Sequence, residues 1–296
     1  MTHASEGLTH WYDRQGRPCY TIKGANGNDR PTTLRDARKL GYVPSVTTII
    51  KCADKPGLNR WQLDQMMHAA LTLPRLHAEP EADWISRVWT DSKETAKKAA
   101  EKGTAIHTAI QGYFEGYLDA STKAETEPYI LGTVDALNDW YPDFAWEAER
   151  SFAHLLGFGG KVDISHHAAA FVADFKTKEF GPDADLKTWD EHAMQLAAYR
   201  IGLGMPTSKC AIVYVSVTVP GLARLIEIPE KELEKGWQMF QGLLAYWKAK
   251  QNFDPSWSEE VVTERVTAEA QDLMNKRLPS SSLLCLHNSR TKRNKE

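Results

Sequence analysis

Hydrophobic residues recur at helical spacing through the middle of the chain. Ile106, Ile110 and Phe114 follow one another four residues apart, the repeat that lines one face of a helix. Pro74 and Pro80 interrupt the pattern upstream. The spacing predicts three helices, over residues 59–73, 81–118 and 129–140.

After residue 143 the period changes from helical to alternating. Alternating apolar and polar residues predict three consecutive strands, over residues 144–152, 157–166 and 170–176. Glycines at Gly157, Gly159 and Gly160 open the second strand. These strands are expected to form a compact β-meander. Downstream, the pattern predicts a helix over 190–203, strands over 211–218 and 223–228, and a last helix over 230–250.

The segment before residue 60 combines a turn signal with a local excess of basic residues. β-Forming residues flank Asp13-Arg14-Gln15-Gly16, which predicts a hairpin over 11–23, followed by a polar loop over 24–31. Between residues 29 and 60, seven lysines and arginines face three aspartates. This basic segment is either a surface that faces phosphates or an ordinary solvated charged face.

Composition fits a folded globular protein. The 296 residues are 42% hydrophobic and 25% charged, and the formal net charge is −3, so any nucleic-acid surface must be local. We expect one domain over 1–278, with an N-terminal hairpin and basic segment over 11–58, a helical region over 59–140 and a core over 144–250. Residues 279–296 are expected to form a disordered basic tail.

Cysteine spacing and hydropathy indicate the compartment. Cys19, Cys52, Cys210 and Cys285 lie far apart without a CxxC pair, which argues against a zinc ribbon or a clustered iron–sulfur site. The longest apolar stretch, 210–219, is too short to span a bilayer. A cytoplasmic protein that does not enter membranes is therefore expected.

Candidate chemistry gathers on the second and third predicted strands. Asp163 lies on the second, and Asp174 and Lys176 share one face of the third because they are two residues apart. Two neighbouring carboxylates repel each other unless a divalent cation lies between them, and oxygen ligands suit Mg²⁺ or Mn²⁺. The alternative is a simple salt bridge between Asp174 and Lys176 at a sheet edge.

Two helices carry further candidates. Gln195 and Tyr199 are four residues apart on the helix after the strands, so they share a face and can both bind phosphate oxygens. His107 follows Gly103 by one turn, and the glycine allows close approach to a neighbouring element. A single helical histidine is otherwise more often structural than a ligand.

The ordered set of motifs resembles the RecB-type branch of the PD-(D/E)xK nuclease superfamily, which includes phage recombination and mitochondrial genome-maintenance exonucleases. The resemblance covers Trp11 to about Ile228. It depends on five motifs in the family's order and an acid-bearing strand, 144–152, before the third of them: Val43-Pro-Ser-Val-Thr-Thr-Ile-Ile50, Gly103-Thr-Ala-Ile-His107, Gly159-Gly-Lys-Val-Asp163, Asp174-Phe-Lys176 and Gln195-Leu-Ala-Ala-Tyr199. It implies an α/β fold with a restriction-endonuclease-like core, a central mixed β-sheet flanked by helices, and a helical insert before the core strands.

The resemblance also implies roles for individual residues. The implied catalytic residues are Asp163, Asp174, Lys176 and Glu149, and the implied metal ligands are His107, Glu149, Asp163, Asp174 and the carbonyl of Phe175. Gln195 and Tyr199 would brace the site and touch the DNA backbone. Glu147 also qualifies for the glutamate position, and spacing favours Glu149. The implied cofactor is Mg²⁺ or Mn²⁺, and no iron–sulfur cluster is expected.

The implied activity is hydrolysis of DNA phosphodiester bonds by a metal-dependent exonuclease in phage or bacterial recombination, repair or replication. Alternatives are a structure-specific or nicking endonuclease and a catalytically inert DNA-binding subunit of the same fold. Ser45 and Thr47 are candidates for backbone contacts, and Trp61, Trp84 and Trp89 either stack on bases or pack the insert's own core. Expected partners are single-stranded DNA or duplex ends and a single-strand annealing or single-strand-binding protein.

Overall fold

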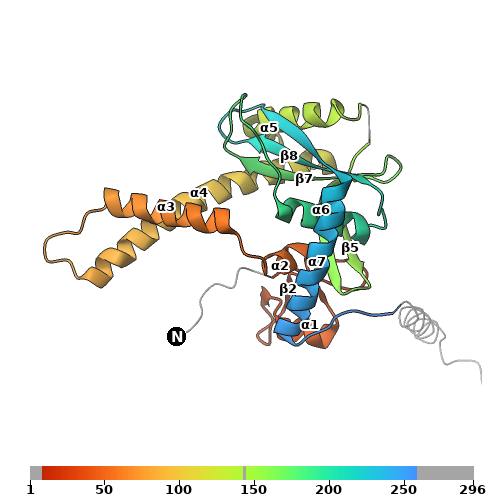
Figure 1. Ribbon diagram of the computed structural model, residues 1–296, viewed down its shortest axis with the longest axis horizontal. Coiled ribbons are helices and arrows are strands. Elements are labelled where there is room, and N and C mark those ends of the chain that lie inside the picture. Colours follow the sequence, from red (N-terminus) through yellow and green to blue (C-terminus); the bar gives the residue numbers. More distant parts are fainter. Residues whose placement is uncertain (1–8, 143–144, 259–296) are drawn as a thin grey trace, which may run out of the picture. The chain divides into compact units, whose positions relative to one another are not determined.

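A five-stranded mixed sheet lies at the centre of the part of the chain that the computed structural model describes, residues 9–142 and 145–258 (Figure 1). Its strands lie side by side in chain order and are β5 (Glu147–His154), β6 (Phe158–His166), β7 (Phe171–Lys178), β8 (Lys209–Ser216) and β9 (Ala223–Ile228). Strands β7 and β8 are parallel, and the other neighbours are antiparallel. The parallel pair requires a crossover, which α6 (Asp190–Gly202) provides.

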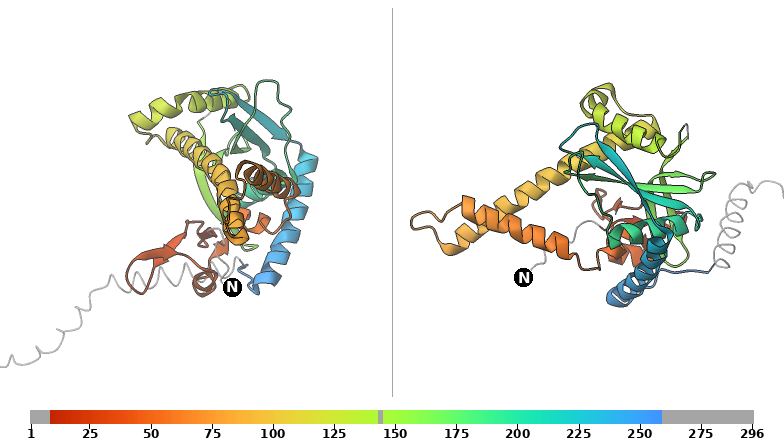
Figure 2. Two further views of the ribbon diagram at one scale, coloured as in Figure 1. Left: turned by 90° about the vertical axis from the view of Figure 1, so that its left-hand side faces the viewer. Right: turned by 45° about the horizontal axis from the view of Figure 1, so that its top comes forward.

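Helices cover both faces of the sheet (Figure 2). Alternate residues along each strand point to opposite faces, so Val172 and Ile212 belong to one core, whereas Phe171 and Ala211 belong to the other. The first core includes residues of α2 (Val46–Ile50), α6 and α7 (Glu230–Gln251), and the second includes residues of α4 (Glu81–Glu115) and α5 (Ala120–Asn138). The sheet therefore separates two hydrophobic cores.

A two-helix arm precedes the core strands. The arm consists of α3 (Pro56–Thr72) and the first part of α4, and the two helices extend together away from the sheet (Figures 1 and 2). The last part of the same α4 packs on the sheet through Ile106, Ala109 and Ile110, which are at most 3% exposed. One 35-residue helix therefore belongs to both the arm and the core.

The N-terminal segment forms only part of the predicted hairpin. The turn is present, since Tyr12 makes an antiparallel bridge to Pro18 and the Cys19 amide donates to the Trp11 carbonyl. Beyond it, β1 (Trp11–Tyr12) pairs with β4 (Val43–Pro44), and β2 (Thr21–Lys23) pairs with β3 (Asp29–Pro31). The predicted loop over 24–31 is thus partly strand. Short-range turn signals cannot specify the pairing of β1 with β4, because β4 lies beyond α1 (Leu34–Leu40) in the sequence.

The predicted fold class is confirmed: the chain is α/β, with a mixed sheet flanked by helices and a helical insert before the core strands. Helix α5 starts nine residues before its predicted start at residue 129, because the Asp119 side chain accepts the Ser121 and Thr122 amides and caps it. Pro128 is tolerated inside that helix. The boundary predicted between residues 278 and 279, and the basic tail after it, lie outside the described residues. Among the helices that the structure describes, none has the length and apolar character to cross a membrane.

Candidate active site

The antiparallel pairing of β6 and β7 stops at the two predicted aspartates. Ile164 pairs with Ala173, and continuing the register would pair Asp163 with Asp174, but no such pair forms. Instead, Asp163 Oδ2 accepts a hydrogen bond of 2.8 Å from the Phe175 backbone amide. The Asp163 side chain thus pairs with a backbone amide that has no partner in the β6–β7 ladder, and both aspartates lie where the two strands separate.

Strand β6 changes face at the same position. Val162 packs in the core with α6, whereas Ile164 packs in the core with α4, although regular alternation would place both on one face. In the neighbouring β5, Ala148 pairs with Ile164 and Arg150 with Val162, which leaves Glu149 in the register position opposite Asp163. Glu149 has a φ of +56°, a strained left-handed conformation that is rare for residues with a side chain.

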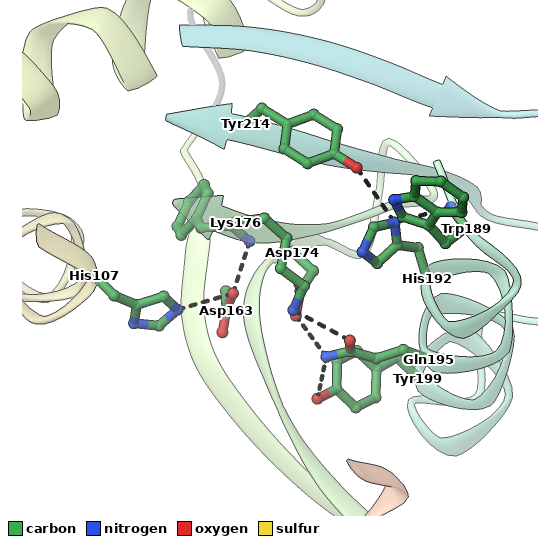
Figure 3. A network of polar contacts seen from close by, with 10 residues as sticks. His107, Asp163, Asp174, Lys176, Trp189, His192, Gln195, Tyr199 and Tyr214 are labelled. Carbon is green, nitrogen blue, oxygen red and sulfur yellow. Dashed lines mark hydrogen bonds and ion pairs between the residues drawn. The ribbon is translucent and has the colours of Figure 1, made fainter. Parts of the chain in front are cut away.

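Asp174 and Lys176 lie together on the other strand and are held by α6. Asp174 is 2% exposed, and its Oδ2 lies 2.5 Å from Lys176 Nζ. Gln195 links the pair, because its Nε2 donates to Asp174 Oδ1 at 2.7 Å and its Oε1 accepts from Lys176 Nζ at 3.2 Å (Figure 3). The same Nε2 lies 2.9 Å from the Tyr199 hydroxyl. The predicted i, i+4 pair on α6 therefore braces the aspartate and the lysine.

His107 reaches the site from the opposite layer. Its Nε2 lies 3.0 Å from Asp163 Oδ2 (Figure 3). Gly103 makes this approach possible, since a Cβ at that position would lie 2.5 Å from Thr177 Oγ1 on β7. The histidine is thus a neighbour of the aspartates and not only a core residue.

Glu149 and Glu147 differ in their surroundings. The Glu149 side chain is 7% exposed and forms an ion pair with Lys161, whereas the Glu147 side chain is 52% exposed and pairs with Arg150. Lys161 is a neighbour of the site that was not among the predicted site residues. Its position two residues before Asp163 was the available signal, because period-two alternation brings such residues toward one face.

Burial and neighbouring charges shift the pKa values of the three acids in different directions. Burial raises the pKa of Asp174 to about 6, and Lys176 only partly offsets the effect. Burial also raises the pKa of Glu149, with Lys161 opposing it. For Asp163, burial alone would raise the pKa, but the His107 hydrogen bond and the positive charges nearby lower it overall.

Neighbouring acids favour the charged forms of the two bases of the site. Burial would lower the pKa of Lys176, but Asp174 and Asp163 outweigh it, so the pKa is raised and the side chain stays an ammonium group at neutral pH. The pKa of His107 is raised in the same way by Asp163, against the effect of burial. Each carboxylate therefore has a basic partner from the chain itself: Asp163 with His107, Asp174 with Lys176, and Glu149 with Lys161.

The donor set fits a hard divalent cation. Carboxylate oxygens are ligands that Mg²⁺ and Mn²⁺ prefer, whereas the imidazole of His107 is a ligand more typical of other transition metals. Among the described residues, Asp174 Oδ2 and Glu149 Oε2 are buried and accept no regular hydrogen bond, although each faces a lysine in an ion pair. In the described part of the chain, no three histidine, cysteine or acidic side chains are close enough together to form a ready-made metal site.

The predicted backbone-contact residues serve a helix in this structure. Ser45 is 4% exposed, and its Oγ accepts the Thr48 amide at 3.0 Å as the cap of α2. Thr47 Oγ1 lies 3.0 Å from the same Ser45 oxygen. Ser45 also bridges to Gly159 of β6, which places this cap beside the strand that carries Asp163. A role of Ser45 and Thr47 in DNA contact stays a prediction.

A second polar network, absent from the predicted site, joins α6 and β8 near Lys176. His192 Nδ1 accepts the Trp189 amide at 3.2 Å and lies 3.3 Å from the Tyr214 hydroxyl (Figure 3). Burial, with Lys176 nearby, lowers the pKa of His192 to about 4. No sequence spacing links a residue on α6 with one on β8, so only the fold brings this pair together.

Comparison with known proteins gives structural neighbours only. No family model matches the chain, and no curated protein matches it. One solved structure, a candidate exonuclease from Eubacterium rectale, is 14% identical with a TM-score of 0.37, over 51% of this chain and 68% of that one. Another, SSO0001, is 15% identical with a TM-score of 0.25, over 63% of this chain and 86% of that one.

Proposed function

We propose that the chain is a divalent-metal-dependent deoxyribonuclease of PD-(D/E)xK type that degrades DNA from an end. The observation that carries the proposal is the meeting of Asp163, Asp174 and Lys176 where β6 and β7 separate. A surface salt bridge would leave the carboxylate exposed, but Asp174 is 2% exposed and held by Gln195. Perturbed, buried acids beside a fixed cation are typical of catalytic sites.

The acids of the site are the proposed metal ligands. Asp163, Asp174 and the Phe175 carbonyl would hold Mg²⁺ or Mn²⁺, with His107 and Glu149 as further ligands. When bound, such a cation supplies Lewis acidity at a phosphate oxygen. The buried Asp174 and Glu149 have raised pKa values, and a cation between the acids would favour their charged forms.

Lys176 is proposed to act as a hydrogen-bond donor. Its raised pKa keeps the amine protonated, so it can orient a water molecule or stabilise negative charge on the phosphate, but it does not accept a proton at neutral pH. Gln195 fixes the ammonium group through its Oε1 and fixes Asp174 through its Nε2. A small shift of Gln195 would therefore misplace both groups.

The test is a comparison of linear and covalently closed circular DNA. With Mg²⁺ or Mn²⁺, the proposal expects the purified chain to degrade linear DNA, to leave the closed circle intact and to lose all activity in EDTA. A nicked circle would identify an endonuclease instead. A shifted but undegraded substrate in every condition would identify a binding subunit without catalysis.

The biological role is the finer part of the same proposal. Action in phage or bacterial recombination, repair or replication implies a single-strand annealing or single-strand-binding partner at the resected strand. The order of digestion on 5′- and 3′-labelled duplexes would define which strand that partner receives.

A further inference from the structure

The arm contains a cavity that the proposed catalysis does not use. It lies between α3 and α4 and has a volume of about 380 Å³, which is within the range of small-molecule sites. The residues that line it come from both helices: Asn59, Trp61, Gln62, Leu63, Gln65, Met66, Trp89, Ser92 and Lys93. A cavity of this size on a projecting arm is a candidate binding site.

Two exposed tryptophans from the two helices contribute to the cavity. Trp61 on α3 is 39% exposed and Trp89 on α4 is 47% exposed. The third tryptophan of the arm, Trp84, differs, because its Nε1 donates to the Leu73 carbonyl at 2.7 Å and so serves the arm's own structure. Lys93 Nζ lies 4.4 Å from the centre of the Trp89 ring, in a cation–π contact. The exposed pair offers aromatic surface to a flat ligand.

The polar lining indicates the chemistry of that ligand. Asn59, Gln62 and Gln65 each carry both a donor and an acceptor on an uncharged amide, and Ser92 adds a hydroxyl. Lys93 is the charged residue among those that line the cavity. Aromatic faces with neutral amides at the edge, next to one cation, match a nucleobase attached to a phosphate backbone.

The charge distribution along α4 indicates where the phosphate backbone of a bound DNA strand would lie. From residue 81 to 91 the helix has three acids and one arginine, but from 93 to 102 it has four lysines and two glutamates. The stretch has a net positive charge and lies between the cavity and His107. Within it, Lys97 and Lys98 form exposed i, i+4 ion pairs with Glu101 and Glu94, and Lys102 Nζ donates to the Val217 carbonyl. Eighteen residues separate Trp89 from His107, about 27 Å at the helical rise of 1.5 Å per residue. At about 3.4 Å per stacked nucleotide, this span corresponds to about eight nucleotides.

We infer that the arm cavity between Trp61 and Trp89 binds one unstacked nucleobase of the DNA strand, about eight nucleotides from the residue held at Asp163 and Asp174. This inference deepens the proposed function and depends on it for the orientation of the strand. The phosphates between the two points lie along the lysines of α4. The site would take any base, since stacking on aromatic rings tolerates every base.

The experiment is an abasic-site scan in EDTA, where no cleavage can occur. Single-stranded 16-mers with one abasic position each are titrated against the full chain, and the dissociation constant is measured by fluorescence anisotropy. The inference expects a loss of affinity of about 5- to 100-fold at one or two adjacent positions, about eight nucleotides from one end. Trp61→Ala and Trp89→Ala should each weaken binding of the unmodified 16-mer and flatten the scan, and Trp89→Phe should keep the localised loss.

Leu71→Ala is the matched control on the same arm. Leu71 is 79% exposed and does not line the cavity, so its truncation should leave the scan unchanged. A wild-type scan with equal losses at all positions would overturn the inference, and so would tryptophan variants that keep the localised loss. Concentration-dependent association of the chain that Trp61→Ala abolishes, together with a flat scan, would instead assign the cavity to contact with a second copy.

Failure of this inference can be told apart from failure of the proposed function. If the protein digests linear DNA with Mg²⁺ but gives equal losses at all abasic positions, the base-binding role of the cavity is excluded and the nuclease proposal stands. If the loss of affinity is localised but the protein digests no DNA, the cavity is a DNA-binding site and the nuclease proposal is excluded.

Discussion

The face of β7 that carries Asp174 and Lys176 and the α3–α4 arm place polar and apolar groups in opposite ways. On β7, Asp174 is 2% exposed, and its carboxylate accepts a hydrogen bond from Gln195 and forms an ion pair with Lys176. On the arm, Leu71 is 79% exposed and Met67 is 66% exposed. Burying a charge lowers the stability of the fold unless the charge is paired and hydrogen-bonded. A single exposed apolar side chain has little effect on stability, and several together can contact a ligand. The polar groups of the core are therefore held in place by their neighbours, whereas apolar side chains of the arm are exposed.

The largest effect should follow from removing the ammonium group at the site. Lys176→Ala is expected to reduce the rate of DNA cleavage by about 10³-fold or more, because a fixed donor for developing charge is lost, while the dissociation constant for DNA changes little. Rates with Mg²⁺ and binding in EDTA measure the two separately. Lys187→Ala is the control, since Asp185 and Lys187 repeat the Asp-x-Lys string on an exposed segment. Normal turnover by Lys176→Ala would exclude the proposed role.

A single methyl group should distinguish packed from open positions on one helix. A Cβ at Gly236 would lie 2.5 Å from the Ala193 backbone, so Gly236→Ala must displace α6 and is expected to lower the free energy of unfolding by about 1–3 kcal/mol. Gly242, on the same α7, has nothing within 4 Å, and Gly242→Ala should raise stability by up to about 1 kcal/mol. Urea denaturation measures both. Equal effects from both variants would contradict the observed packing of α6 on α7.

Acid should destabilise the core through His192. Its pKa is about 4 in the folded chain because of burial, below the usual value of 6.5, so the unfolded chain binds more protons between these pH values. Stability from this group is complete above pH 6.5 and falls as the pH drops toward 4, by up to about 3 kcal/mol. His192→Asn keeps an acceptor for the Trp189 amide and removes the titration. A wild-type stability that falls no more steeply than that of the variant would contradict this assignment.

The smallest effect is expected on the exposed side of the arm. Met67→Gln should change the free energy of unfolding by less than about 0.5 kcal/mol, because the side chain is 66% exposed and loses little packing. Cleavage of linear DNA should be unchanged. A loss of more than about 1 kcal/mol would show that this surface is packed in solution and would weaken the contrast between arm and core.

The sequence predicted much of the site because short spacings carry its geometry. Asp174 and Lys176 share a strand face two residues apart, and Gln195 and Tyr199 share a helix face four residues apart. These local rules survive folding. The predicted meander of three strands is confirmed, since β5, β6 and β7 are antiparallel neighbours in chain order.

Other features could not be predicted because they depend on distant partners or on broken periodicity. Strand β6 changes face at Asp163, opposite the strained Glu149, and no alternation rule anticipates such a change. The pairing of β1 with β4 joins residues about thirty positions apart. The contact of His192 with Tyr214 requires the crossover to be in place.

Because α4 is one continuous helix, the number of residues between the cavity and His107 fixes both their distance and their relative orientation around the helix axis. Deleting one residue between Trp89 and His107 would turn everything upstream by about 100° and shorten the span by about 1.5 Å, so the aromatic rings would face a different direction relative to the imidazole. Adding seven residues, close to two full turns, would lengthen the span by about 10.5 Å and nearly restore the orientation. Homologous chains that keep both ends should therefore differ here by whole turns, and an insertion of any other size should come with a change in the arm itself.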